Sequence, residues 1–223
     1  MSRSPDISLA STMDEHEELA ALFARIWQVP EPSQIYPASL LRAVEFAGNY
    51  VAVAKLDGRI VGGAVAFFGR GGHLHSDIAG VDASVRGRGI GLALKLHQRS
   101  WALERGVRSI QWTFDPTLFR NARLNIHRLG GYAVAYLPDF YGRMDDGINA
   151  DTGPSDRLLV DWRIDTPRVR GAITEGLAEP TDGLRVPIGP LDRLRADLTK
   201  AFDDGMRITD VTVDNHYIME RPG

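Results

Sequence analysis

The sequence lacks cysteine altogether and has only three lysines, Lys55, Lys95 and Lys200. Without a thiol there is no disulfide, no thiolate metal site, no iron–sulfur cluster and no cysteine nucleophile. Catalysis by this chain must therefore use oxygen or nitrogen groups, or a bound cofactor.

Long apolar runs are absent as well. No stretch approaches the roughly 20 apolar residues of a membrane span, and the first residues lack the apolar run of a signal peptide. We therefore expect a cytoplasmic protein without a membrane partner. The formal net charge of −3 argues against a nucleic-acid partner, because such proteins usually present a basic face.

The remaining composition is that of an ordinary globular protein. Of 223 residues, 43% are hydrophobic and 25% charged, which suits one large domain or a domain with an appendage. Such a chain can bury a proper core, so no metal is needed to explain its stability and none is expected.

The predicted elements follow the order strand, two helices, three strands, helix, strand, helix, two strands, which is typical of a mixed α/β domain. The expected strands are 6–10, 50–56, 59–68, 73–81, 109–114, 132–137 and 158–164, and the expected helices are 12–29, 37–47, 91–105 and 118–129. A Pro- and Gly-rich stretch, 166–190, then leads to a helix at 191–202 and strands at 206–213 and 215–220. We expect a domain over 1–164 and an α/β extension over 165–223 that packs on it.

A glycine-rich run, Arg86-Gly-Arg-Gly-Ile-Gly91, joins an expected strand to an expected helix. It is not a P-loop, because no lysine follows the last glycine, and it misses the third glycine of a dinucleotide fingerprint, since position 92 is leucine. A strand that opens into a helix through small residues still binds pyrophosphate well, because free amides and the helix dipole favour an anion. An ordinary glycine turn is the alternative.

The longer pattern Val81-x-x-x-Val-Arg-Gly-Arg-Gly-Ile-Gly-x-Ala-Leu94 resembles the acetyl-CoA loop of the GNAT acyltransferases, and the order of elements around it is similar too. The resemblance implies a mixed sheet flanked by helices and an acetyl-CoA or other acyl-CoA donor. It implies that the strands starting near Val81 and Ser109 splay to admit the pantetheine arm. The implied cofactor-binding residues are Val81, Ala83, Arg86, Gly87, Arg88, Gly89, Ile90 and Gly91.

The expected helix 118–129 adds to the resemblance. Asn121 and Asn125 lie one turn apart, and in GNAT enzymes the matching helix commonly lends an asparagine to the pantetheine amide. The family's usual tyrosine, seven residues after that asparagine, is absent, because position 128 is arginine. A solvated basic face is expected for His127 together with Arg120 and Arg123.

A narrower resemblance rests on further short motifs, and it covers the chain nearly from end to end. They are Leu74-His-Ser76, Trp112-Thr-Phe-Asp-Pro116, Phe140-Tyr-Gly142 and Pro154-Ser-Asp-Arg157. They resemble a branch of the family with members that N-acylate amino acids, for instance by N-succinylation, beside an N-acylamino-acid racemase.

Amide formation needs a base for the amine and a proton for the leaving thiolate. His75 and Asp77 are two residues apart on an expected strand and so share a face, and a histidine titrates near neutral pH. We expect one of them to serve as the base. Each of them could instead only hydrogen-bond within the fold.

The long loop 138–157 carries further candidates, since loops of this length in compact domains are more often functional than idle. Tyr141 could protonate the thiolate, and Arg157 could bind a substrate carboxylate. The expected substrate-binding residues are Asn149, Ser155, Asp156 and Arg157. A surface ion pair between Asp156 and Arg157 is the alternative.

Together these observations predict an acyl-CoA-dependent N-acyltransferase that acts on a small-molecule amine such as an amino acid. A non-catalytic CoA-binding sensor of the same fold is the alternative, and a protein-lysine acetyltransferase would need an open peptide groove. Neither a His-Glu-x-x-His zinc motif nor a Gly-x-Ser-x-Gly hydrolase motif occurs. A homodimer stays open as the assembly.

Overall fold

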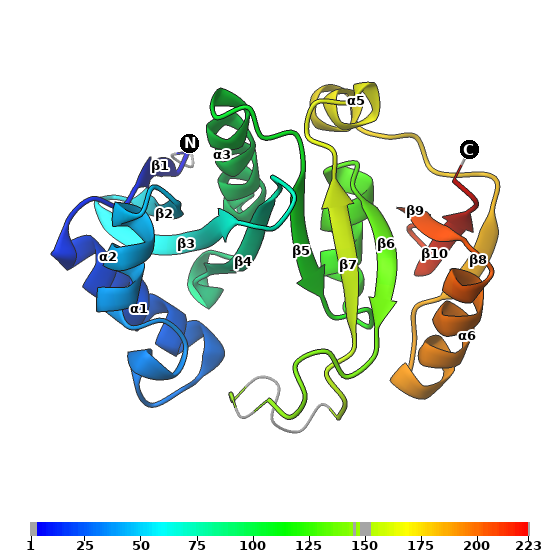
Figure 1. Ribbon diagram of the computed structural model, residues 1–223, viewed down its shortest axis with the longest axis horizontal. Helices are drawn as coiled ribbons and strands as arrows, with labels where there is room; N and C mark the ends of the chain where they lie inside the picture. The colour runs from blue at the N-terminus through cyan, green and yellow to red at the C-terminus, as the bar shows by residue number, and fades with distance from the viewer. Residues whose placement is uncertain (1–3, 145, 148–152, 223) are drawn as a thin grey trace. The chain divides into compact units, whose positions relative to one another are not determined.

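The computed structural model describes residues 4–144, 146–147 and 153–222 of the chain (Figure 1). The chain divides into two compact units, residues 1–107 with 145–151 and residues 108–144 with 152–223. The division into a domain over 1–164 and an extension over 165–223 stays a prediction.

The first unit is an antiparallel sheet with helices, in the strand order β1–β2–β3–β4 (Figure 1). A tight turn joins β2 to β3 through Asp57 and Gly58, both with positive φ, as the Asp-Gly pair predicts. The elements are β1 (Asp6–Leu9), α1 (Met13–Trp27), η1 (Pro32–Gln34), α2 (Ala38–Phe46), β2 (Tyr50–Leu56), β3 (Arg59–Phe68), β4 (Leu74–Val81), η2 (Ala83–Val85) and α3 (Ile90–Glu104).

Two adjacent glycines in β3 let a helix approach each face of this sheet. A Cβ atom on Gly63 would lie 2.3 Å from Leu19 of α1, and one on Gly62 would lie 3.3 Å from Ile90 of α3. Because neighbouring residues of a strand point to opposite faces, α1 and α3 cover opposite sides of the sheet. The core beneath α1 is largely apolar, with Leu19, Leu22 and Phe23 buried against the strands, and it also contains the buried His16.

The second unit has the strand order β5–β7–β6–β9–β10–β8 (Figure 1). Strand β6 pairs with β7 over its whole length, but with β9 only at Ala133 and Ile208. The elements are β5 (Ile110–Phe114), α4 (Phe119–Ala122), η3 (Arg123–Arg128), β6 (Tyr132–Leu137), β7 (Arg157–Trp162), α5 (Pro167–Thr174), β8 (Leu184–Pro187), α6 (Leu191–Asp203), β9 (Arg207–Val211) and β10 (His216–Glu220).

Two sequence expectations are wrong in this unit. The single α-helix expected over 118–129 is a short α-turn that continues as the π-helical segment η3, in which the Leu129 amide donates to the Leu124 carbonyl. The stretch 166–190, expected to be irregular, contains α5 and β8. Thr166 caps α5 and Pro167 stands at its first position, a start signal that the surrounding glycines and prolines obscured.

Helix α6 is tied to the sheet by a buried ion pair. Asp156, at the start of β7, accepts hydrogen bonds from both Nε (2.8 Å) and Nη2 of Arg195 on α6, from the hydroxyl of Tyr136 on β6, and from the amide of Asp139 at 2.9 Å. Burial alone would raise the pKa of the Asp156 carboxyl, but the hydrogen bonds from Arg195 and Tyr136 outweigh it and the pKa is lowered. No helix in the described ranges is long and apolar enough to cross a membrane.

Candidate active site

The glycine-rich run forms an open loop between β4 and α3. Gly87 and Gly89 have φ of +81° and +78°, a left-handed backbone that glycine adopts without strain, and nothing lies within 4 Å of a Cβ atom added to either. The amides of Gly87, Gly89, Ile90 and Gly91 donate no hydrogen bond to another described residue. These free donors surround the N-terminus of a 15-residue helix, where the helix dipole favours an anion.

The side chains around the loop also favour the binding of an anion. Arg86 and Arg88 are exposed, and the Arg86 Nε reaches the carbonyl of Val81 at 3.4 Å. Ala83 stands in η2, whose first turn is capped by the Asp82 carboxylate bound to the Ser84 amide. Backbone donors, two guanidinium groups and open space above the glycines fit a pyrophosphate.

His75 and Asp77 lie on β4, which carries a β-bulge at Asp77. Val65 of β3 pairs with Ile78 and Ala66 pairs with Ser76, so that Asp77 is the extra residue. Such bulges re-aim side chains and often occur beside active sites. The His75 Nε2 lies 3.9 Å from the Asp77 Oδ1, with the two side chains 24% and 31% exposed. The two side chains therefore lie on one face of the strand as expected, and their role as a base stays a prediction.

Burial lowers the pKa of His75, and the positive charges of His73 and Lys95 lower the pKa further. The negative charge of the neighbouring Asp77 partly offsets this decrease. The imidazole is therefore mostly neutral at pH 7, the form that accepts a proton. The ring of Phe67 lies 5.2 Å from that of His75 and shields one side of it.

Sequence reasoning missed two residues of this cluster, Tyr36 and Lys95. The Tyr36 hydroxyl, from the segment between α1 and α2, donates to the Asp77 Oδ2 at 2.6 Å. Lys95 of α3 is buried and donates to the Ser76 Oγ at 2.8 Å, and burial lowers its pKa to about 7. Nothing in the local pattern marks Tyr36, whereas a lysine within an apolar helix stripe is a signal that could have found Lys95.

In the second unit, Tyr141 and Arg157 lie together. The Tyr141 hydroxyl shares a hydrogen bond with the Thr113 hydroxyl at 3.0 Å, and the Arg157 guanidinium lies 5.2 Å from the centre of the Tyr141 ring. Arg157 is only 9% exposed, yet within the described chain it donates only to the Asp156 carbonyl and the Met144 sulfur. A buried guanidinium without a carboxylate partner favours an anionic ligand.

The other expected substrate-binding residues have structural partners. The Ser155 Oγ accepts a hydrogen bond from the Tyr141 amide at 2.9 Å, and Asp156 pairs with Arg195 rather than with the Arg157 side chain. The surface ion pair considered for Asp156 and Arg157 is therefore not formed. Asn149 lies outside the described residues.

The two asparagines of the π-helical region differ in their surroundings. Asn121 is exposed on α4, whereas Asn125 is buried in η3 and its carbonyl accepts the Gly131 amide at 3.2 Å. Their role toward pantetheine stays a prediction.

The solvated basic face expected for His127 is wrong. His127 is buried, and its Nδ1 lies 2.8 Å from the Asp210 Oδ1 on β9. Arg123 donates to Glu179 at 2.9 Å.

Comparison with known proteins identifies the family of the chain. The sequence profile of the acetyltransferase (GNAT) family matches residues 16–130, slightly more than half of the chain, and includes the loop and β4. No curated protein matches the chain in sequence.

Solved structures share the fold at low sequence identity. An N-acetyltransferase from Staphylococcus aureus Mu50 has a TM-score of 0.60 at 15% identity, covering 73% of this chain and 99% of its own. The protein yncA from Salmonella typhimurium, solved with its cofactor acetyl-CoA, has a TM-score of 0.57 at 15% identity, covering 80% and 99%. A ribosomal-protein-alanine N-acetyltransferase from Brucella melitensis has a TM-score of 0.56 at 19% identity, covering 70% and 98%. The expected fold, a mixed sheet flanked by helices, is confirmed.

Proposed function

We propose an activity for this chain, which belongs to the acetyltransferase (GNAT) family. It transfers an acetyl or other short acyl group from an acyl-CoA to an amine. The amine belongs to a small carboxylate-bearing molecule such as an amino acid. The observation that carries this proposal is the pair of His75 and Asp77 on the bulge of β4, in the same unit as a loop with four free amides. A base and an anion-binding loop are what direct acyl transfer requires.

The loop is proposed to hold the CoA pyrophosphate. The amides of Gly87, Gly89, Ile90 and Gly91 would donate to phosphate oxygens, with Arg86 and Arg88 adding positive charge. The structurally similar protein yncA from Salmonella typhimurium was solved with its cofactor acetyl-CoA, which supports a CoA ligand for this chain.

His75 is proposed as the base. Its neutral imidazole takes a proton from the substrate ammonium, and the free amine then attacks the thioester carbonyl, so that a C–N bond forms and the C–S bond breaks. Asp77 stabilises the imidazolium that results, and Tyr36 keeps the Asp77 carboxylate in place through its 2.6 Å hydrogen bond. As the C–S bond breaks, the amide nitrogen loses its second proton to solvent and the leaving thiolate gains one, for which Tyr141 is proposed as the donor; the Tyr141 hydroxyl is then reprotonated from solvent.

Arg157 supports the choice of a carboxylate-bearing acceptor. Its guanidinium is buried over the Tyr141 ring and has no carboxylate partner within the described chain. A substrate carboxylate would supply the missing charge through a bidentate pair. An assay with a panel of acyl-CoA donors that includes succinyl-CoA would identify the acyl group.

A steady-state assay of CoA release tests the proposal, with acetyl-CoA and pairs of amines that differ only in a carboxylate, such as an amino acid and its decarboxylated counterpart. We expect turnover with the amino acid of at least one pair. His75→Ala should lower kcat on the order of 10²–10⁴-fold, while His73→Ala, at the start of the same strand, should change it little. Wild-type kcat/KM should fall as the pH drops through the lowered pKa of His75.

Arg157→Gln separates binding from chemistry in the same assay. It should raise KM for the amino acid roughly 10–100-fold, in line with the loss of a charge-assisted pair, and leave the decarboxylated amine unaffected. If CoA raises the melting temperature but no amine in the panel releases CoA, the chain is a CoA-binding sensor. If His75→Ala retains full activity per folded molecule, His75 is not the base.

A further inference from the structure

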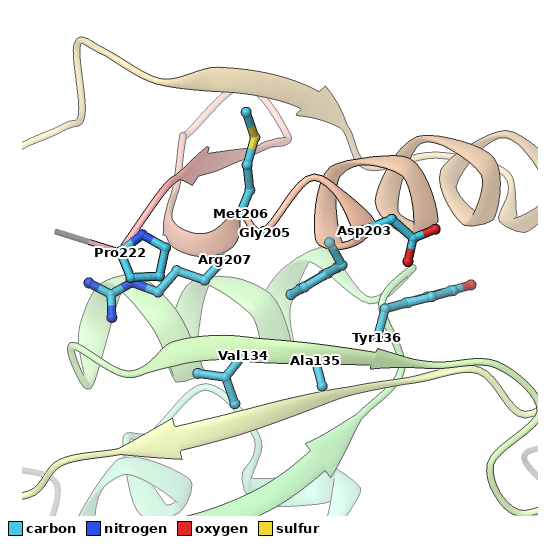
Figure 2. Close-up of a pocket in the computed structure, with 9 residues that line it drawn as sticks. Val134, Ala135, Tyr136, Asp203, Gly205, Met206, Arg207 and Pro222 are labelled. Atoms are coloured by element: carbon cyan, nitrogen blue, oxygen red, sulfur yellow. The ribbon is translucent and has the colours of Figure 1, made fainter.

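A pocket lies in the C-terminal part of the second unit, among residues to which the proposed acyl transfer assigns no role. It has a volume of about 430 Å³, within the range of small-molecule sites. It lies between β6, the end of α6 and the start of β9 (Figure 2). Its walls are Val134, Ala135, Tyr136, Phe202, Asp203, Gly205, Met206, Arg207 and Pro222.

The pocket exists because β6 and β9 separate. They pair only at Ala133 and Ile208, so that no strand in the described chain pairs with this edge of β6 beyond Ala133. Such an edge carries backbone donors and acceptors that can bind an extended peptide as an added strand. The apolar walls from Val134, Phe202 and Met206 suit the side chains of such a peptide.

Arg207 supplies a cation to the pocket. Its Nε is buried and has no hydrogen-bond partner among the described residues, and its guanidinium lies over the Tyr132 ring with 4.1 Å between its central carbon and the ring centre. Glu220 lies opposite Arg207 in the β9–β10 register, yet the two form no ion pair among the described residues. A guanidinium held flat on a ring and lacking an acceptor is suited to a carboxylate.

Asp203 supplies the opposite charge. It is exposed and makes no hydrogen bond or ion pair within the described chain. Figure 2 shows its carboxylate toward the same end of the pocket as the Tyr136 hydroxyl, while Arg207 lies toward the other end beside Pro222. An amino acid carries both charges on one carbon, so the separation of Asp203 from Arg207 favours a longer zwitterion.

We propose that this pocket binds a short apolar peptide of two or three residues, with its carboxylate on Arg207, its ammonium on Asp203 and its backbone along the free edge of β6. None of the residues that line this pocket has a role in the proposed acyl transfer, and its occupancy does not depend on that reaction.

Isothermal titration calorimetry on the full chain, without acetyl-CoA, tests the proposal. The probes are the dipeptide leucyl-phenylalanine, its N-acetyl form and its C-terminal amide. The free dipeptide should bind saturably, and each blocked form should bind on the order of tenfold or more weakly, as expected for the loss of a charge-assisted hydrogen bond.

Paired variants assign each end of the ligand. Arg207→Gln should weaken the free dipeptide about as much as amidation does and should not weaken the amide further, because the contact is already lost. Asp203→Asn should weaken the free dipeptide about as much as N-acetylation does, and it should not weaken the N-acetyl form further. Arg221→Gln, an exposed arginine of the same C-terminal segment, is the matched control and should change nothing. Both pocket variants should keep wild-type CoA release.

Loss of the Arg207 stacking could lower stability, so the melting temperature of each variant is measured, and the exposed Asp203→Asn keeps the test decisive if Arg207→Gln fails to fold. The proposal is overturned if no probe binds saturably at millimolar concentration. It is also overturned if binding ignores both variants, or if His75→Ala abolishes it, since the peptide would then occupy the acyl-transfer site.

Discussion

The ion pair between Asp156 and Arg195 should contribute a large share of the stability of the second unit. The change to make is Asp156→Asn, which keeps the size of the side chain but removes its charge and one acceptor. The Asp156 side chain is 1% exposed and that of Arg195 is 38% exposed. Removing one partner of a buried pair costs about 3–5 kcal/mol, and water around Arg195 reduces this figure.

We therefore expect a loss of about 2–3 kcal/mol in the free energy of unfolding at pH 7. For a chain of this length that corresponds to a melting temperature lower by about 4–12 °C. Urea unfolding and calorimetry both measure it. The matched control is Asp165→Asn, whose pairs with Arg170 and Arg108 are exposed and should be worth less than about 1 kcal/mol.

The pH dependence adds a second check. Because the pKa of Asp156 is lowered in the folded state, the pair contributes fully above the unfolded pKa of about 4 and is lost only as the pH falls through the lower folded value. The difference between wild type and Asp156→Asn should thus be constant from pH 5.5 to 8 and shrink below pH 4. If Asp156→Asn is no less stable than Asp165→Asn at pH 7, the network does not hold α6 to the sheet.

Three further predictions concern the first unit. Tyr36→Phe removes the 2.6 Å hydrogen bond to Asp77 and should lower kcat/KM about tenfold with little change in melting temperature; equal kinetics would remove Tyr36 from the site. Gly89→Glu should abolish the stabilisation by acetyl-CoA seen in thermal unfolding, because its carboxylate would lie where phosphate belongs, whereas Gly72→Glu, with a similar φ of +83°, should retain it; loss in both would indicate backbone strain alone. Lys95 has its pKa lowered to about 7 by burial, so the unfolded chain binds more protons between pH 7 and 10 and wild-type stability should rise over that range by about 3–4 kcal/mol relative to Lys95→Met; parallel pH profiles in urea unfolding would contradict this.

Sequence patterns predicted the turns and helix starts that depend only on neighbouring residues. The Asp57-Gly58 turn, the Thr12 capping box of α1 and the glycines before α3 each depend on residues within a few positions, and all three occur as expected. The two-residue spacing of His75 and Asp77 placed both on one face, but the bulge at Asp77 depends on the register with β3, which no alternation pattern reveals.

Contacts between distant segments could not be predicted in this way. Tyr36 reaches Asp77 across 41 positions, and Arg195 reaches Asp156 across 39. Each partner looks like an ordinary polar surface residue in its own segment. His127 was misjudged for the same reason, because its partner Asp210 lies 83 positions away on β9.

The π-helical segment η3 has a consequence for counting along the chain. A π-turn accommodates one residue more than an α-turn, so positions beyond it are shifted by one relative to a regular helix. The position that lies seven residues after Asn121 in a regular helix corresponds here to Leu129, which is buried, and not to Arg128. Neither is tyrosine. An alignment of Arg123–Arg128 with a regular α-helix therefore needs a one-residue gap, and deleting one residue there should restore an α-helical frame.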